Sequence, residues 1–221
     1  MRTIGIVMQS EKSFEEGAIN FLRDIEKGNG FRELNRGIGH SRTLLQVGIG
    51  EHTGLVFKNG YVAHAQAANR YYHKLVNYFK ARGYEPGSYG LAEPKFVAVG
   101  EHLGVIQEYF DEPSLSELGN YLVMIKQKGV REKKLSRDLN AAEINGMGEK
   151  FGLKSESKLR CEQLLKRQQN ADITLEQMIE VEREFKEDWE YFNMWIKPEN
   201  VIVLGKRETE PDKIGLAIID Y

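Results

Sequence analysis

Glycine divides residues 31–110 into short apolar runs, and this spacing limits most strongly what the chain can fold into. The runs are FRELNRG, RTLLQVGIG, GLVFKNG, KFVAVGE and LGVIQEYF. Each has the length of a strand and is bounded by glycine, which permits a turn. The longer stretch 62–83 has no interior glycine or proline, repeats apolar residues at helical spacing and ends at a glycine. We therefore expect an antiparallel meander with one helix, 62–83, packed on it.

Residues 114–195 show a helical period instead. Apolar residues separated mainly by steps of three and four are Leu115, Leu118, Leu122, Ile125, Leu175, Met178, Ile179, Phe185 and Trp189. With charged residues between them, they predict amphipathic helices, and Asp188 and Glu190 are expected on an exposed helix face. Asp172 or Thr174 could cap the last helix, with Gln177 three residues after Thr174. NVIVLG and IGLAIID, separated by KRETEPDK, then predict a β-hairpin, so the predicted fold class is α+β.

The overall composition narrows the classes of partner. The 221 residues carry 31 basic and 33 acidic side chains, so net charge favours neither nucleic acid nor an anionic membrane. No apolar stretch approaches the roughly 20 residues of a membrane span, and the N-terminus lacks the apolar region of a signal peptide. The single cysteine, Cys161, excludes an internal disulfide and predicts a packed or half-exposed thiol. We expect a cytoplasmic protein.

A glycine turn and a lysine strand form the first candidate binding feature. Gly37 and Gly39 lie where the first predicted strand turns back, and glycine amides can approach a phosphate without interference from a Cβ atom. Lys58 ends the third predicted strand and could reach phosphate oxygens from beneath that turn. Near the end of the chain, Asn200 and Asp220 each accompany a β-branched apolar run. Their oxygen atoms are of the kind that Mg²⁺ prefers.

The order of these features resembles the protein-kinase-like superfamily. Its landmarks are a glycine loop, a lysine about twenty residues later, one helix, two strands and a hinge. LVFK ends in the matching lysine, and LGVIQEYFDEPSLSEL is similar to the fifth strand and hinge, with Ser114 opening the next helix. IKPENVIV is similar to the end of the catalytic loop and the strand after it, and GLAIIDY to the strand that carries a metal-binding aspartate. KPENVIV is the most specific of these matches.

This resemblance implies a bilobal fold. Residues 1–30 would form an N-terminal helical extension and residues 31–110 a small β-rich lobe. Residues 111–221 would form a truncated helical lobe that ends in the hairpin, because the resemblance stops at Asp220 and Tyr221. The activation segment and substrate-docking helices of an ordinary kinase would follow that point.

The resemblance also implies a cleft for ATP and Mg²⁺. The residues that would contact the nucleotide are Gly37, Gly39, Lys58, Glu108, Tyr109 and Phe110. Asn200 and Asp220 would bind the metal. Lys58 and Asp220, with these ligands in place, would support transfer of the γ-phosphoryl group to a serine or threonine of a protein substrate.

Three departures from the family pattern concern chemistry. Arg42 replaces the third glycine of the loop, and the helix 62–83 contains no acid to hold Lys58. Trp195 stands five residues before Asn200, where the family has its aspartate base, and a tryptophan cannot accept a proton. Glu199, beside the expected metal ligand, is the candidate substitute in catalysis.

Three interpretations therefore remain open from the sequence. The first is a minimal, atypical kinase that transfers phosphate by positioning and electrostatics. The second is a pseudokinase, a module that binds nucleotide or a protein partner without catalysis. The third is an unrelated α+β protein in which KPENVIV is a coincidence.

Overall fold

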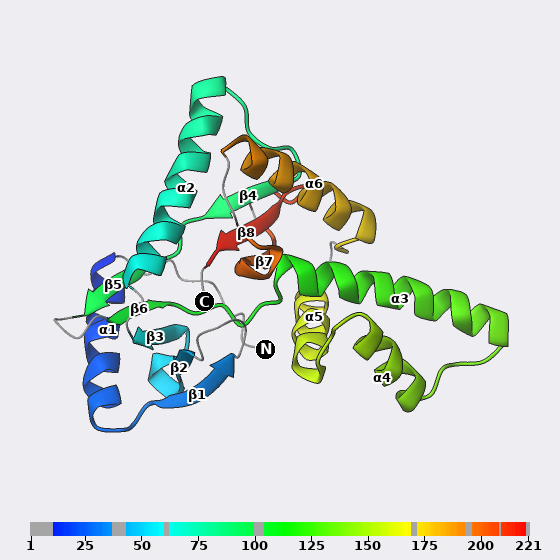
Figure 1. Ribbon diagram of the computed structural model, residues 1–221, viewed down its shortest axis with the longest axis horizontal. Helices are drawn as coiled ribbons and strands as arrows, with labels where there is room; N and C mark the ends of the chain where they lie inside the picture. The colour runs from blue at the N-terminus through cyan, green and yellow to red at the C-terminus, as the bar shows by residue number, and fades with distance from the viewer. Residues whose placement is uncertain are drawn as a thin grey trace. The chain divides into compact units, whose positions relative to one another are not determined.

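The computed structural model shows a mixed α+β fold, as the sequence predicts (Figure 1). It describes residues 11–36, 43–59, 62–99, 104–168, 172–192, 196–207 and 209–219. Several residues of the expected ATP site lie outside these ranges, namely Gly37, Gly39, Arg42, Trp195 and Asp220.

The chain forms two compact units. One, here called the sheet unit, comprises Met1–Ala67 and Pro94–Phe110. The other, the helical unit, comprises Ala68–Glu93 and Asp111–Tyr221. The chain therefore crosses between the units three times, and the segment 68–93 belongs with the helices rather than with the rest of 31–110.

The sheet unit contains a five-stranded antiparallel sheet. Its strands are β1 (Phe31–Arg36), β2 (Thr43–Gly48), β3 (Leu55–Asn59), β5 (Phe96–Val99) and β6 (Gly104–Glu108). They are hydrogen-bonded in the order β1-β2-β3-β6-β5, and every neighbouring pair is antiparallel. A short 3-10 helix, η1 (Gly50–His52), joins β2 to β3. All five strands coincide with the glycine-bounded runs from which they were predicted.

Helix α1 (Glu11–Glu26) packs on this sheet. Ala18 and Phe21 are fully buried and pack with Ile106 of β6. The predicted helix is present as α2 (Val62–Arg82), but it passes from the sheet unit into the helical unit after Ala67. Its buried residues Leu75 and Phe79 belong to the core of the helical unit. The helix whose packing on the sheet the described contacts show is α1, which lies within the predicted N-terminal helical extension.

Four further α-helices build the helical unit. They are α3 (Leu115–Leu135), α4 (Ala141–Lys150), α5 (Ser155–Arg167) and α6 (Leu175–Tyr191). Ser114 caps α3, as expected. Thr174 caps α6: its side chain accepts from the Gln177 amide at 3.2 Å, and its own amide donates to the Gln177 side chain at 3.1 Å. This confirms the cap predicted for Thr174.

Cys161 lies in the core of the helical unit, as the prediction of a packed thiol allows. It is fully buried on α5. Burial raises the pKa of its thiol to about 12, so the sulfur stays protonated at neutral pH. The residue therefore acts as a small apolar side chain.

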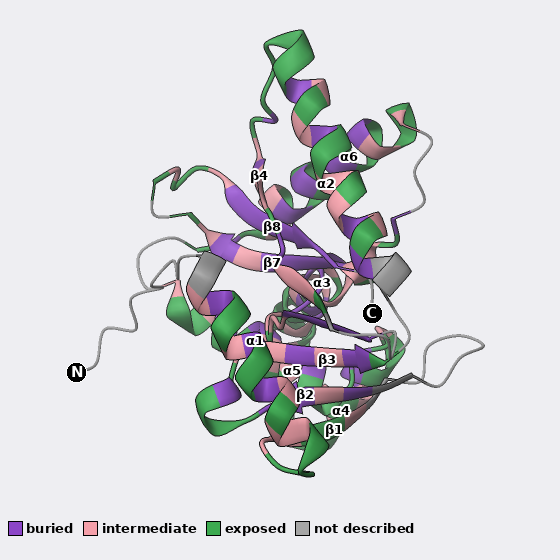
Figure 2. Cartoon of the chain, turned by 90° about the vertical axis from the view of Figure 1, so that its left-hand side faces the viewer, coloured by how far each residue is buried: buried purple, intermediate pink, exposed green. Residues whose placement is uncertain are grey.

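A three-stranded mixed sheet completes the helical unit. Strands β7 (Val201–Lys206) and β8 (Ile214–Ile218) form the predicted hairpin. Strand β4 (Tyr89–Ala92), which the sequence analysis did not predict, pairs with β8 in parallel. Figure 2 shows β8 buried along its length. A parallel sheet with strands from both sides of residue 140 is incompatible with the kinase-like fold that the resemblance implies, so this ladder argues directly against that resemblance.

Asp188 corrects another expectation. It is 5% exposed and accepts a hydrogen bond from the hydroxyl of Tyr89, although the sequence analysis placed it on a solvent-facing stripe. Desolvation raises the pKa of its carboxyl. Glu190, two residues later on α6, is exposed as expected. Asp188 thus holds the buried end of Tyr89 in place.

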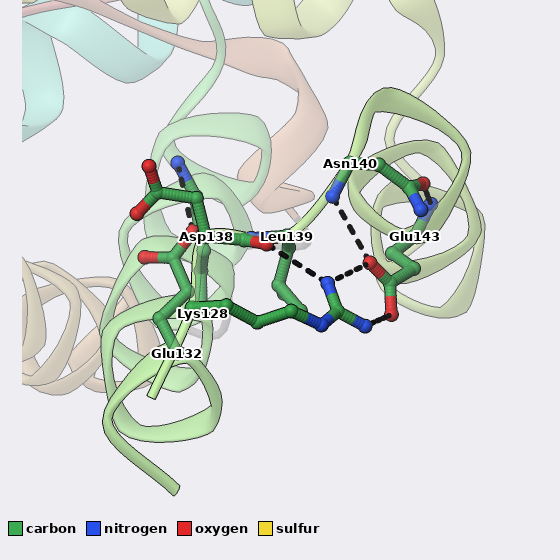
Figure 3. Close-up of polar contacts among 7 residues, drawn as sticks. Lys128, Glu132, Asp138, Leu139, Asn140 and Glu143 are labelled. Carbon is green, nitrogen blue, oxygen red and sulfur yellow. Dashed lines mark hydrogen bonds and ion pairs between the residues drawn. The ribbon is translucent and has the colours of Figure 1, made fainter. Parts of the chain in front are cut away.

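The connection between α3 and α4 is held by a polar network (Figure 3). Ser136 ends α3 in the left-handed conformation, with φ 51°. Arg137 then binds Glu143 through two hydrogen bonds of 3.0 Å, and Glu143 also accepts from the amide of Asn140 at 3.0 Å. The side chain of Asn140 in turn accepts from the Glu143 amide at 3.0 Å, which completes a capping box. Glu143 therefore fixes both the start of α4 and the preceding turn.

Stability should respond to pH through Glu143. Hydrogen bonding to Arg137 lowers the pKa of this carboxyl to about 2, from an ordinary value of 4.5. Because the pKa of Glu143 is lower in the folded state, its carboxylate stabilises the fold above about pH 4.5. This stabilisation is lost as the pH falls towards 2. We expect Glu143→Gln to melt at a lower temperature than wild type at pH 7, with the difference closing over that interval.

Glu149→Gln is the matched control for this measurement. Glu149 is exposed on the same helix and has no ion pair among the described residues. Its melting temperature should follow wild type at each pH. A Glu143→Gln deficit that stays constant from pH 7 to pH 2 would contradict the assignment.

Candidate functional site

Lys58 lies on one face of the five-stranded sheet. It pairs with Leu45 of β2 and with Val105 of β6. Residues directly opposite each other in a ladder share a face, and alternate residues of a strand return to it. The face, here called the Lys58 face, therefore comprises Leu45, Val47, Val56, Lys58, Val105 and Gln107. The ring of Phe57 and the side chain of Leu55 belong to the opposite face, with α1.

Lys58 is almost completely buried, at 1% exposure. The sequence predicted the strand and the end at which the lysine lies, but it did not predict that the ammonium group would be enclosed. Burial of a cation is unfavourable unless anionic or polar groups compensate it.

Gln107 is the second polar residue of the Lys58 face, and sequence reasoning missed it. It is 1% exposed, and its Oε1 atom has no hydrogen-bond partner among the described residues. An unsatisfied buried acceptor costs about 1–3 kcal/mol. The sequence did contain a signal for a polar residue on this face. Gln107 ends the apolar run GVIQ and lies on the same side of the strand as Val105.

The connector after β6 only partly matches the adenine site that the resemblance implies. The amide of Glu108 donates to the carbonyl of Lys95 at 2.9 Å, and the amide of Tyr109 donates to Gly54 at 2.8 Å. Neither donor remains for a ligand. The amide of Phe110 has no backbone partner among the described residues, and Phe110 is half-exposed. Of the three connector residues predicted to contact the nucleotide, Glu108 and Tyr109 use their amides within the protein, and only Phe110 has no backbone partner for its amide among the described residues.

Asn200 lies at one end of the β7–β8 hairpin. It closes the 3-10 helix η2 (Pro198–Asn200), and Val201 pairs with Ile218 immediately after it. The amide of Ile219 donates to the carbonyl of Asn200 at 2.8 Å. Asp220, the next residue in the sequence, lies outside the described residues. The hairpin register thus brings Asn200 next to Ile219, and the pair of metal ligands formed with Asp220 stays a prediction.

The remaining predicted site residues separate into two groups. Glu199 is exposed on η2, in the helical unit with Asn200. Lys58 and Phe110 belong to the sheet unit. On α2, which carries no acid, His73 lies 3.4 Å from Glu93, so it has an acidic partner within the helical unit.

A cluster of one histidine and two acidic residues in the sheet unit was not predicted. His52 Nε2 lies 2.9 Å from a carboxylate oxygen of Asp24 and 3.8 Å from one of Glu51. Hydrogen bonds from His52 and Lys27 lower the pKa of the Asp24 carboxyl. The ring of His52 is buried beside Phe21, so the pair ties η1 to the end of α1. The two partners are 28 positions apart, and no local pattern marks such a contact.

Comparison with known proteins gives no match, whether to a family model, to a curated protein or to a solved structure. None of the described helices is both long and apolar enough to cross a lipid bilayer. Function is therefore inferred from the residues of this chain.

Proposed function

We propose that the chain binds ATP with Mg²⁺ in the manner of a minimal kinase-like protein. The observation that carries the proposal is the buried lysine on the Lys58 face, beside a glutamine with an unsatisfied oxygen. Lysine side chains are seldom buried this completely, and the Gln107 oxygen is a buried acceptor that a bound ligand would satisfy.

The chemistry of the Lys58 face suits a nucleotide. Val47, Val56 and Val105 are buried around Lys58, and the Lys58 ammonium would offer positive charge to phosphate oxygens. Along the sheet unit the elements also follow the expected order, with β1, β2 and β3 before α2 and with β5 and β6 after it. Asn200 and Asp220 would supply the oxygen ligands of Mg²⁺.

A thermal-shift titration with ATP and Mg²⁺ tests the proposal. Ligand at 100 times its dissociation constant adds about 2.7 kcal/mol of stability. We expect the melting temperature of wild type to rise with ATP, and Lys58→Met to need at least about tenfold more ATP for the same shift, because the phosphate loses its cation.

Lys74→Met is the control, because Lys74 is an exposed lysine on α2 and loses the same charge. Its ATP response should equal that of wild type. An equal response from Lys58→Met would disprove the role of Lys58. If wild type shows no response to ATP, with or without Mg²⁺, the better interpretation is an α+β protein unrelated to kinases. The β4–β8 ladder also favours that interpretation.

A pseudokinase is the second candidate function. It is favoured by Trp195 in place of the base and by the absence of an acid from α2. Such a protein would bind the nucleotide, or only a protein partner, and transfer no phosphate. Measurement of phosphate transfer separates it from a working kinase, as described in the Discussion.

A further inference from the structure

A cavity in the helical unit begins where helix α2 ends. The amide of Gly83 donates to the carbonyl of Lys80, and the amide of Tyr84 donates to the carbonyl of Phe79 at 3.1 Å. Gly83 has φ +58°, which a glycine adopts without strain. These two bonds form a Schellman motif, in which the residue after the glycine packs back onto the helix. The rings of Tyr84 and Phe79 accordingly lie 5.9 Å apart.

Three aromatic rings line the cavity, which has a volume of about 410 Å³. Tyr89 of β4 joins Phe79 and Tyr84, and its ring lies 6.4 Å from that of Phe79. The hydroxyl of Tyr89 is engaged by the buried Asp188, so this residue offers the cavity its ring rather than its polar end. The volume is in the range of small-molecule sites, about 300–1,000 Å³.

Charged side chains from the β7–β8 loop line the other side of the cavity. Arg207 lies against Gly90 of β4: a Cβ atom at Gly90 would be 2.5 Å from its Nη1 atom, so glycine leaves room for the guanidinium. Arg207 donates to Glu210 at 2.6 Å. Lys213 lies 3.1 Å from Glu210 and 3.1 Å from Glu85.

The side chains that line the cavity carry a net positive charge. The described lining residues include three cations, Lys80, Arg207 and Lys213, against two carboxylates, Glu85 and Glu210. The ammonium group of Lys80 is exposed and has no ion pair with another described residue. An arginine also has five N–H donors, so Arg207 has more donors than Glu210 uses.

From these features we infer that the cavity binds a small molecule that combines an aromatic ring with one anionic group. The ring would lie on Tyr84, which the buried rings of Phe79 and Tyr89 support from behind, and the anion would face Lys80 and Arg207. This site goes beyond the proposed ATP site. Asn200 lies at one end of β7 and Arg207 follows the other end, about 20 Å away at the rise of a strand.

Fluorescence titration with 8-anilinonaphthalene-1-sulfonate tests the inference, because this probe joins aromatic rings to one sulfonate. We expect saturable binding to the folded protein. Lys80→Glu should weaken it about tenfold by placing a like charge beside the sulfonate. Tyr84→Ala should weaken it by removing a ring that is 41% exposed and is therefore not needed for the core.

Lys74→Glu makes the same charge change on the same helix, away from the cavity lining, and should bind the probe as wild type does. The uncharged probe N-phenyl-1-naphthylamine should bind wild type and Lys80→Glu equally. Three results would each overturn the inference: no saturable binding, equal weakening by Lys80→Glu and Lys74→Glu, or unchanged affinity in Tyr84→Ala. None of these readouts depends on ATP.

Discussion

Replacement of Phe185 by alanine is expected to lower the free energy of unfolding of the helical unit by about 3–5 kcal/mol. The Phe185 side chain is 1% exposed, and its ring lies 5.6 Å from that of Tyr89 and 6.2 Å from that of Trp189. Truncation removes these contacts and leaves a cavity that the surrounding helices and sheet can fill only in part. Since native domains have only about 5–15 kcal/mol of stability, this loss is a large share of the total.

Urea denaturation followed by tryptophan fluorescence measures this effect. Both tryptophans, Trp189 and Trp195, belong to the helical unit, so the signal reports on the unit that carries the mutation. Ile179→Ala is the control, since Ile179 lies on the same helix but is 58% exposed, and we expect a change within about 0.5 kcal/mol. Equal midpoints for the two variants would contradict the observed packing of α6.

Asp220→Ala is expected to reduce phosphate transfer at least about 100-fold if the chain is a working kinase. Its carboxylate would hold the Mg²⁺ that neutralises the charge developing on the transferred phosphate. The assay follows radiolabelled phosphate from ATP to the protein itself or to proteins of a lysate. Asp212→Ala, which removes an exposed aspartate from the loop of the same hairpin, should retain full transfer.

Glu199→Gln distinguishes how transfer proceeds without the usual base. If Glu199 orients the accepting hydroxyl, its amide variant should be slower than Lys197→Gln, a change at an exposed neighbour. If ATP raises the melting temperature and no label moves with any divalent metal, the pseudokinase is the better description. Asp220→Ala would then affect only stability or partner binding.

Local patterns predicted the elements whose partners are close in sequence. The antiparallel strands of the sheet unit are short apolar runs between glycines, and the β7–β8 hairpin joins two such runs through a polar loop. The cap at Thr174 was also predictable, because both members of its capping box lie within one turn. In each case the residues that form the element itself lie close together in the sequence, although the pairing of β3 with β6 joins distant segments.

Contacts between distant segments were not predictable in this way. Strand β4 has only four residues and no apolar alternation, and its partner lies far along the chain. Asp188 looks like a surface acid on α6 until Tyr89 is placed beside it, because burial depends on that partner. The enclosure of Lys58 likewise follows from side chains on three different strands, so the sequence could name the lysine but not its environment.

The parallel pairing of β4 with β8 has a consequence for synthesis. Tyr89 pairs with Ile214, so residues 93–213 must all be translated before the ladder can close. At the usual rate of about 5–20 residues per second, this takes on the order of 10 s. The sheet unit, whose last strand ends at Glu108, can assemble on the ribosome meanwhile, whereas β4 waits with an unpaired edge. The nascent chain is therefore most prone to aggregate during this interval, and chaperones that bind nascent chains should raise its yield.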